Sequence, residues 1–93
     1  MQRSLYIVAY DVRHPVRLRR ILHVIKDYAS GGQKSVFECY LSNTERKSLL
    51  AQAQQTLLLD IDSFAIIRLD QKRPIYLLGT AVAPSDQIYT YLG

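Results

Sequence analysis

The chain has 93 residues, 48% of them apolar, and its 12 lysines and arginines against 8 acids give a net charge of +4. This length fits one small domain, residues 1–93, and the apolar content excludes a disordered chain. With Cys39 as its one cysteine, the chain forms no internal disulfide. The apolar run of residues 5–10, before Asp11, is too short for a signal peptide or a membrane span. We therefore expect a cytoplasmic protein with no membrane contact.

The first predicted elements are a strand and a helix. Residues 4–11 are rich in β-branched and aromatic side chains and are apolar on both faces, which predicts a central strand buried on both sides. Pro15 suits the first turn of a helix, and apolar residues then recur at helical spacing up to Tyr28. The glycine pair Gly31 and Gly32 is predicted to end this helix.

The rest of the chain predicts more strands around a second helix. Residues 33–41 alternate as a strand, residues 42–44 offer an N-cap, and residues 45–58 contain good helix formers. Residues 61–69 and 75–78 are typical of two further strands. The order strand, helix, strand, helix, strand, strand indicates an α+β fold. We expect a ferredoxin-like sandwich of the β-α-β-β-α-β type, with the sheet packed against two helices.

The C-terminal tail extends beyond what this fold needs. Residues 88–92 alternate like a further strand. A strand of this kind can pair with an exposed sheet edge, and we expect residues 84–93 to pack on the partner's sheet in a homodimer. Burial of surface in a dimer would also supplement the modest core of so short a chain.

Asp11 is the strongest candidate for chemistry, because ligands often bind at strand ends in open α/β sheets. A helix-capping or turn aspartate is the alternative. One carboxylate holds a hard cation weakly. A two-fold dimer would bring two copies of Asp11 together. Mg²⁺ binds one or two carboxylates and completes its shell with waters and phosphate oxygens. The ion would lower the pKa of a bound water and neutralise phosphodiester charge. Asp60 and Asp62 are a weaker carboxylate pair, typical of a solvated turn.

Basic residues are concentrated after the first strand. A local excess of positive charge favours a polyanion, and a solvated helix face is the alternative. Arg17 and Arg20 lie three apart on the predicted helix, so we expect them close together on one side, with His23 and Lys26 in an adjoining stripe. Guanidinium groups suit phosphate oxygens, which predicts salt-sensitive and weakly sequence-selective binding to a nucleic-acid backbone. The predicted binding residues are Arg13, Arg17, Arg19, Arg20 and Lys34.

Three other side chains are expected to be structural. Tyr10 precedes Asp11 and points to the opposite face of the strand, so we expect it to support the sheet. Phe37 is expected to lie in the core, and Cys39 to pack within its strand rather than act as a nucleophile.

Three segments resemble the CRISPR-associated protein 2 family. Residues 5–12, Leu-Tyr-Ile-Val-Ala-Tyr-Asp-Val, resemble its opening strand, which ends in Tyr-Asp-Ile or Tyr-Asp-Val. Residues 17–21 resemble its basic first helix, and residues 33–38, Gln-Lys-Ser-Val-Phe-Glu, are similar to its second-strand signature. Length and element order agree as well, so the resemblance covers essentially the whole chain.

The resemblance implies a ferredoxin-like homodimer whose C-terminal strand packs on the partner. It also implies a role with CRISPR-associated protein 1, the integrase subunit, in capturing foreign DNA as new spacers, with the small dimer as a bridge that binds duplex DNA. Some members of the family are Mg²⁺-dependent endonucleases on single-stranded RNA or double-stranded DNA. In that role the resemblance implies that Asp11 binds the metal, and that Arg17, Arg19 or Arg20, and Phe37 contribute to activity.

Two predicted loops depart from the family pattern. Gly31 and Gly32 stand where a basic residue is common, and Arg13 and His14 follow Asp11 where acids or serine are common. The second departure favours phosphate binding over metal binding. Our leading hypothesis is a spacer-acquisition subunit with metal-dependent nuclease activity at Asp11. The alternatives are a non-catalytic DNA-binding bridge for the integrase and an unrelated ferredoxin-like module that binds a regulatory ligand.

Overall fold

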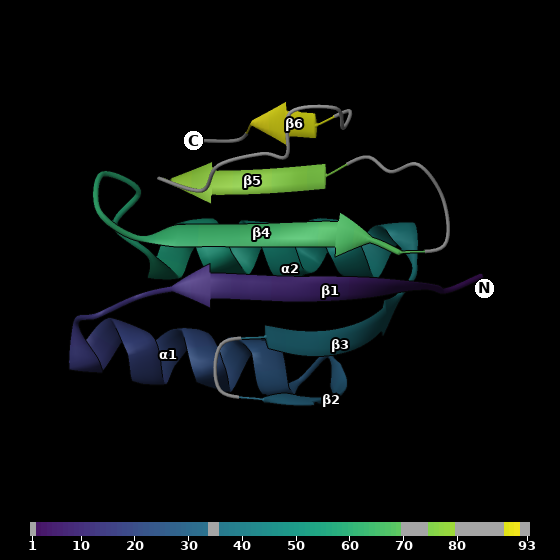
Figure 1. The fold of residues 1–93 in the computed structure, drawn as a ribbon, viewed down its shortest axis with the longest axis horizontal. Coiled ribbons are helices and arrows are strands. Elements are labelled where there is room, and N and C mark those ends of the chain that lie inside the picture. Colours follow the sequence, from purple (N-terminus) through teal and green to yellow (C-terminus); the bar gives the residue numbers. More distant parts are fainter. Residues whose placement is uncertain (1, 34–35, 70–74, 80–88, 92–93) are drawn as a thin grey trace.

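The computed structural model describes residues 2–33, 36–69, 75–79 and 89–91 (Figure 1). In chain order, the elements are β1 (Ser4–Asp11), α1 (Pro15–Lys26), β2 (Ala29–Gln33), β3 (Val36–Leu41), α2 (Asn43–Thr56), β4 (Ser63–Arg68), β5 (Ile75–Gly79) and β6 (Tyr89–Tyr91). The strands form one sheet in the order β2-β3-β1-β4-β5-β6, with both helices on the same face. β1 lies between β3 and β4 and is antiparallel to both.

The predicted element order is wrong between α1 and α2, where two strands stand in place of one. Gly31 and Gly32 do not end the helix but lie within β2, where they pair with Glu38 and Phe37 of β3. The helix ends earlier, because the Asp27 N–H closes its last turn. Glycine is disfavoured inside a strand for its backbone entropy, but the ladder uses only backbone groups, so an edge strand can hold it. The elements up to β4 therefore run β-α-β-β-α-β.

The core lies between the helices and one face of the sheet. Along β1, Tyr6, Val8 and Tyr10 point to the helices and are buried, whereas Ile7 and Ala9 point the other way and are half-buried. The prediction that this strand is buried on both faces is therefore wrong, because the helices cover one face only. The uncovered face, which we call the open sheet face, includes Leu5, Ile7 and Ala9 of β1, Val36, Glu38 and Tyr40 of β3, and Ala65 and Ile67 of β4.

The helix α2 begins at the predicted N-cap. The Ser42 hydroxyl accepts a hydrogen bond from the Glu45 N–H at 3.1 Å, and the Glu45 carboxylate accepts one from the Ser42 N–H at 2.8 Å. Arg3 donates two further hydrogen bonds to the Glu45 carboxylate, at 2.8 and 2.9 Å. The Arg3 guanidinium, with the Ser42 N–H, lowers the pKa of Glu45 to about 2.

The strand β6 lies within the predicted strand of residues 88–92 and runs parallel to β5 of the same chain. Its packing on a partner's sheet stays a prediction, and residues 84–88 lie outside the described part of the chain. Within the described residues, no helix is long and apolar enough to cross a membrane.

Candidate active site and nucleic-acid interface

Asp11 is exposed at the end of β1, where the strand leads into the loop before α1. It is paired with Ser63, the first residue of β4, so the residues that precede Ser63 come close to this end of β1. A cavity of about 320 Å³ opens between the two segments. This cavity, which we call the Asp11 cavity, is lined by Asp11, Arg13, Arg17, Ile61 and Asp62. Asp11 and two of the predicted binding arginines therefore share one site.

The start of α1 brings Arg17 to the cavity. His14 is the N-cap, with an extended backbone at φ −67° and ψ 124°, and its Nδ1 accepts a hydrogen bond from the Val16 N–H at 3.3 Å. Pro15 follows at the first helical position, where its restricted φ suits the helix and its missing N–H costs nothing. Arg17 is thus fixed in the first turn of α1.

Arg17 forms an ion pair with Asp62 at the wall of the cavity. Its Nε donates to Oδ2 at 2.7 Å and its Nη2 donates to Oδ1 at 3.3 Å, while the Leu58 N–H donates to the same Oδ2 at 2.9 Å. The side chains of Arg17 and Asp62 are 15% and 2% exposed. The predicted solvated turn is therefore wrong for Asp62, which can be buried because Arg17 compensates its charge, and correct for the exposed Asp60.

The donor set of the cavity fits a magnesium ion only in part. In the described part of the chain, no three acids, histidines or cysteines gather into a possible metal-binding group. Because Asp62 is engaged by Arg17, one chain contributes mainly the Asp11 carboxylate. Such a site fits Mg²⁺ where waters, phosphate oxygens or a second carboxylate complete the oxygen shell.

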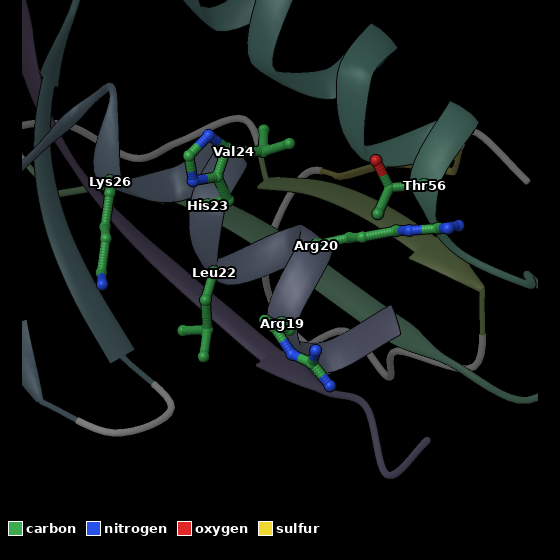
Figure 2. A pocket seen from close by; sticks show the side chains of 7 residues that line it. All are labelled: Arg19, Arg20, Leu22, His23, Val24, Lys26 and Thr56. Carbon is green, nitrogen blue, oxygen red and sulfur yellow. The ribbon is translucent and has the colours of Figure 1, made fainter. Parts of the chain in front are cut away.

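A second set of basic side chains lies over α1, around a separate cavity of about 640 Å³ (Figure 2). Arg20 extends toward the end of α2 that carries Thr56, while Arg19 lies farther from it. Arg17 and Arg20, which were expected together on one side of the helix, line different cavities, because Asp62 holds the Arg17 guanidinium near β4. We call the second set the basic helix face: it comprises Arg19, Arg20, His23 and Lys26. The remaining predicted binding residue, Lys34, lies outside the described residues.

The residues expected to be structural lie on the helix side of the sheet. Tyr10 is 8% exposed and stacks on Phe37, with ring centroids 6.2 Å apart and an interplanar angle of 16°. Burial raises the pKa of Tyr10. Cys39 is fully buried, and this burial raises the pKa of its thiol to about 11. These side chains pack against the core and leave the opposite face to Asp11.

Comparison with known proteins identifies the family. The sequence model for "CRISPR associated protein Cas2" matches residues 4–74 of this chain. The chain belongs to the Cas2 family. The predicted resemblance to this family is thereby confirmed.

Curated Cas2 relatives span most of the chain. CRISPR-associated endoribonuclease Cas2 1 of Thermodesulfovibrio yellowstonii is 40% identical over 91 residues, which cover 98% of this chain and 99% of the relative. CRISPR-associated endoribonuclease Cas2 2 of Nitrosomonas europaea is 35% identical, with 87% of this chain and 72% of the relative covered. CRISPR-associated endonuclease Cas2 2 of Thermus thermophilus is 36% identical, with coverages of 71% and 73%.

Two crystal structures share the fold with this Cas2 chain. A hypothetical protein of Thermus thermophilus matches with a TM-score of 0.71 and 33% identity, over 74% of this chain and 84% of that one. Cas2 of Streptococcus pyogenes matches with a TM-score of 0.64 and 30% identity, over 70% of this chain and 84% of that one. The predicted α+β fold class is confirmed.

Two residues that line the Asp11 cavity, Ile61 and Asp62, were not predicted as site residues, and Asp62 is the charged one. Asp62 was read as part of a solvated turn, although it is buried against Arg17, which lies 45 residues earlier in the chain. The family motifs, at residues 5–12, 17–21 and 33–38, do not include it. The one local signal is its place directly before a strand that pairs with the Asp11 end of β1.

Proposed function

We propose that this Cas2 chain is an endonuclease that cleaves single-stranded RNA, with Asp11 at the reacting phosphate. The observation that carries the proposal is the Asp11 cavity, where an exposed carboxylate lies in one site with Arg13 and Arg17. The relatives that cover 98% and 87% of the chain are named endoribonucleases, and this supports RNA as the first substrate to test. The Thermus thermophilus relative is named an endonuclease, so duplex DNA is the second.

The residues of the cavity have distinct roles in this proposal. Arg13 is exposed and donates to a non-bridging oxygen of the phosphate. Arg17 lies beside it and faces the same phosphate from the first turn of α1. Asp11 accepts the proton and would bind the metal, together with Asp11 of the partner subunit. A bound Mg²⁺ would supply charge neutralisation and a lower pKa for its water.

The proposal includes a symmetric homodimer. The open sheet face is uncovered and, apart from Glu38, presents apolar side chains on β1, β3 and β4, of which Tyr40 is 55% exposed. Pairing of this face with its copy about a two-fold axis would remove apolar surface from water. Asp11 lies on the same face as Ile7 and Ala9 of β1, so this pairing would bring the two Asp11 residues toward one another.

The basic helix face binds the flanking nucleic acid in this proposal. Arg19, Arg20 and Lys26 present three cations around one cavity, apart from the Asp11 cavity. Contacts of this type go to phosphates, so binding should weaken as salt rises and should depend little on sequence.

A second candidate is a non-catalytic DNA bridge that serves the CRISPR-associated protein 1 integrase in spacer acquisition. It is favoured by the separation of the basic helix face from Asp11, because duplex binding there would not need the carboxylate. Arg13 and His14, which directly follow Asp11, also suit phosphate binding better than metal binding.

The test is cleavage of labelled RNA and duplex DNA in Mg²⁺ and in EDTA, with binding measured in parallel. Asp11→Asn should abolish Mg²⁺-dependent cleavage, and its sedimentation should be the same as that of the native protein. Asp27→Asn is the matched control, since Asp27 is an exposed acid at the other end of α1. Undiminished cleavage by Asp11→Asn would refute the catalytic role. Tight duplex binding without any cleavage by the native protein would favour the bridge.

A further inference from the structure

Asp62 is the buried acid at the base of the Asp11 cavity. We propose that Asp62 is a positioning residue, which holds the Arg17 guanidinium in one orientation beside Asp11 so that Arg17 donates to a phosphate oxygen of bound nucleic acid. The inference rests on the proposed function of the Asp11 cavity and adds to it a residue that never touches the substrate.

The geometry of the ion pair leaves Arg17 both fixed and available. A guanidinium has five N–H donors, and Asp62 accepts from two of them, one on Nε and one on Nη2, which leaves three. Those three have no hydrogen-bond partner within the described part of the chain. Because Arg17 lines the cavity that Asp11 and Arg13 also line, a phosphate in the cavity would meet them.

Asp62 can orient Arg17 because Asp62 is itself held on several sides. Its carboxylate accepts the Leu58 N–H at 2.9 Å, and its own N–H donates to the Leu58 carbonyl at 2.8 Å. On another side Gly79 packs so closely that a Cβ there would lie 1.9 Å from the Asp62 carbonyl oxygen. Leu58, just after α2, and Gly79, at the end of β5, thus fix the acid, and the acid fixes the arginine of α1.

Charge balance and positioning make opposite predictions for Asp62→Asn. The ion pair is formally neutral, so the variant adds one positive charge to a site for a polyanion. If Asp62 only balances charge, RNA should bind more tightly and be cleaved at least as fast. If Asp62 positions Arg17, cleavage should fall although binding does not. The amide oxygen can replace Oδ2, but the amide NH2 group is a donor and cannot replace Oδ1 as the acceptor for the Arg17 Nη2, so the two-point contact that orients the guanidinium is lost.

The test compares native protein, Asp62→Asn, Arg17→Ala and the double variant in single-turnover RNA cleavage, with RNA binding in EDTA at several salt concentrations. We expect Asp62→Asn to lower the cleavage rate by about 10- to 100-fold, the scale of a misplaced catalytic contact, with an unchanged or lower Kd. The double variant should be no slower than Arg17→Ala, since Asp62 acts through Arg17. Two results would overturn the inference. One is a double variant whose cleavage rate is reduced by the product of the two single reductions, and the other is an Asp62→Asn variant that cleaves RNA at the native rate.

The matched control is Glu45→Gln, an acid-to-amide change in the Arg3–Glu45 pair, which lies outside both cavities. It should cleave RNA at the native rate. Where Asp62→Asn does not fold, Asp62→Glu replaces it. This variant keeps the charge and displaces the carboxylate by one methylene. Its RNA cleavage rate should fall, and the salt dependence of its RNA binding should not change. Native cleavage by a folded Asp62→Glu would also overturn the inference.

A second measurement does not depend on activity. Exchange of the Arg17 Nε–H with water, followed by ¹H–¹⁵N NMR, should be slow in the native protein and fast in the folded Asp62 variant. If the native protein cleaves no RNA, the proposed function fails, and this exchange still decides whether Asp62 fixes Arg17. Equal exchange rates in the two proteins would reject the positioning role.

Discussion

Asp62→Ala should destabilise the protein strongly, although the residue lies outside the helices and strands, directly before β4. The change removes the acceptor of hydrogen bonds from Arg17 and from the Leu58 N–H, and it leaves the Arg17 charge, 15% exposed, without its partner. Breaking a buried ion pair from one side costs about 3–5 kcal/mol. Arg17 can turn partly toward solvent in the cavity, so we expect the lower end, about 3 kcal/mol, or a Tm about 12–24 °C lower for a domain of this size.

Which of the two single variants, Asp62→Ala or Arg17→Ala, loses more unfolding free energy is a sharper test than the size of either loss. Arg17→Ala leaves the Asp62 carboxylate, which is 2% exposed, without the guanidinium that compensates its charge, so it should cost more than Asp62→Ala, about 4 kcal/mol. The double variant should cost less than the sum of the two, because neither charge is then left unpaired.

The assay is urea unfolding followed by circular dichroism, at one protein concentration because a dimer would make stability concentration-dependent. Asp60→Ala is the matched control: this neighbouring acid is exposed, and its loss should change the free energy of unfolding by less than about 0.5 kcal/mol. A loss below about 1 kcal/mol for Asp62→Ala, or a smaller loss for Arg17→Ala, would refute the ion-pair argument.

Three further predictions concern other parts of the molecule. Burial raises the pKa of Cys39 from 9.0 to about 11, so the free energy of unfolding should decline as the pH rises between these values. A thiol reagent at pH 8 should label the native protein only as fast as the protein unfolds, and rapid labelling would contradict the burial of Cys39. The pKa of Glu45 is lowered from 4.5 to about 2, so its stabilising effect is present above pH 4.5 and is lost as the pH falls toward 2. Glu45→Gln should therefore unfold with a flatter pH dependence in that range, and equal slopes would count against the Arg3 contact. Gly79→Ala should cost about 2–3 kcal/mol or more in urea unfolding, since φ is +65° and the new Cβ meets the Asp62 carbonyl oxygen. Gly31→Ala is its control, because the nearest neighbour there is a Glu38 carboxylate oxygen at 3.7 Å, and equal losses would contradict the clash.

Much of the architecture could be predicted because its signals are local. Pro15 marks the start of α1, and Ser42 with Glu45 forms the capping box that starts α2. The alternation along β1 places Tyr10 and Asp11 on opposite faces, as the structure has them. The hairpin of β2 and β3 was missed because a strand that contains two glycines carries no side-chain pattern, and only its pairing with β3 keeps it extended.

The sequence by itself determined that Asp11 ends a strand, that a basic helix follows it, and that the chain has Cas2 motifs. Only the tertiary structure divided the basic residues between two cavities and joined Arg17 to Asp62. No local pattern links residues 45 positions apart. The antiparallel register that sets Asp11 opposite Ser63 places Asp62 next to the first turn of α1, and there a buried carboxylate is stable because the Arg17 guanidinium compensates its charge.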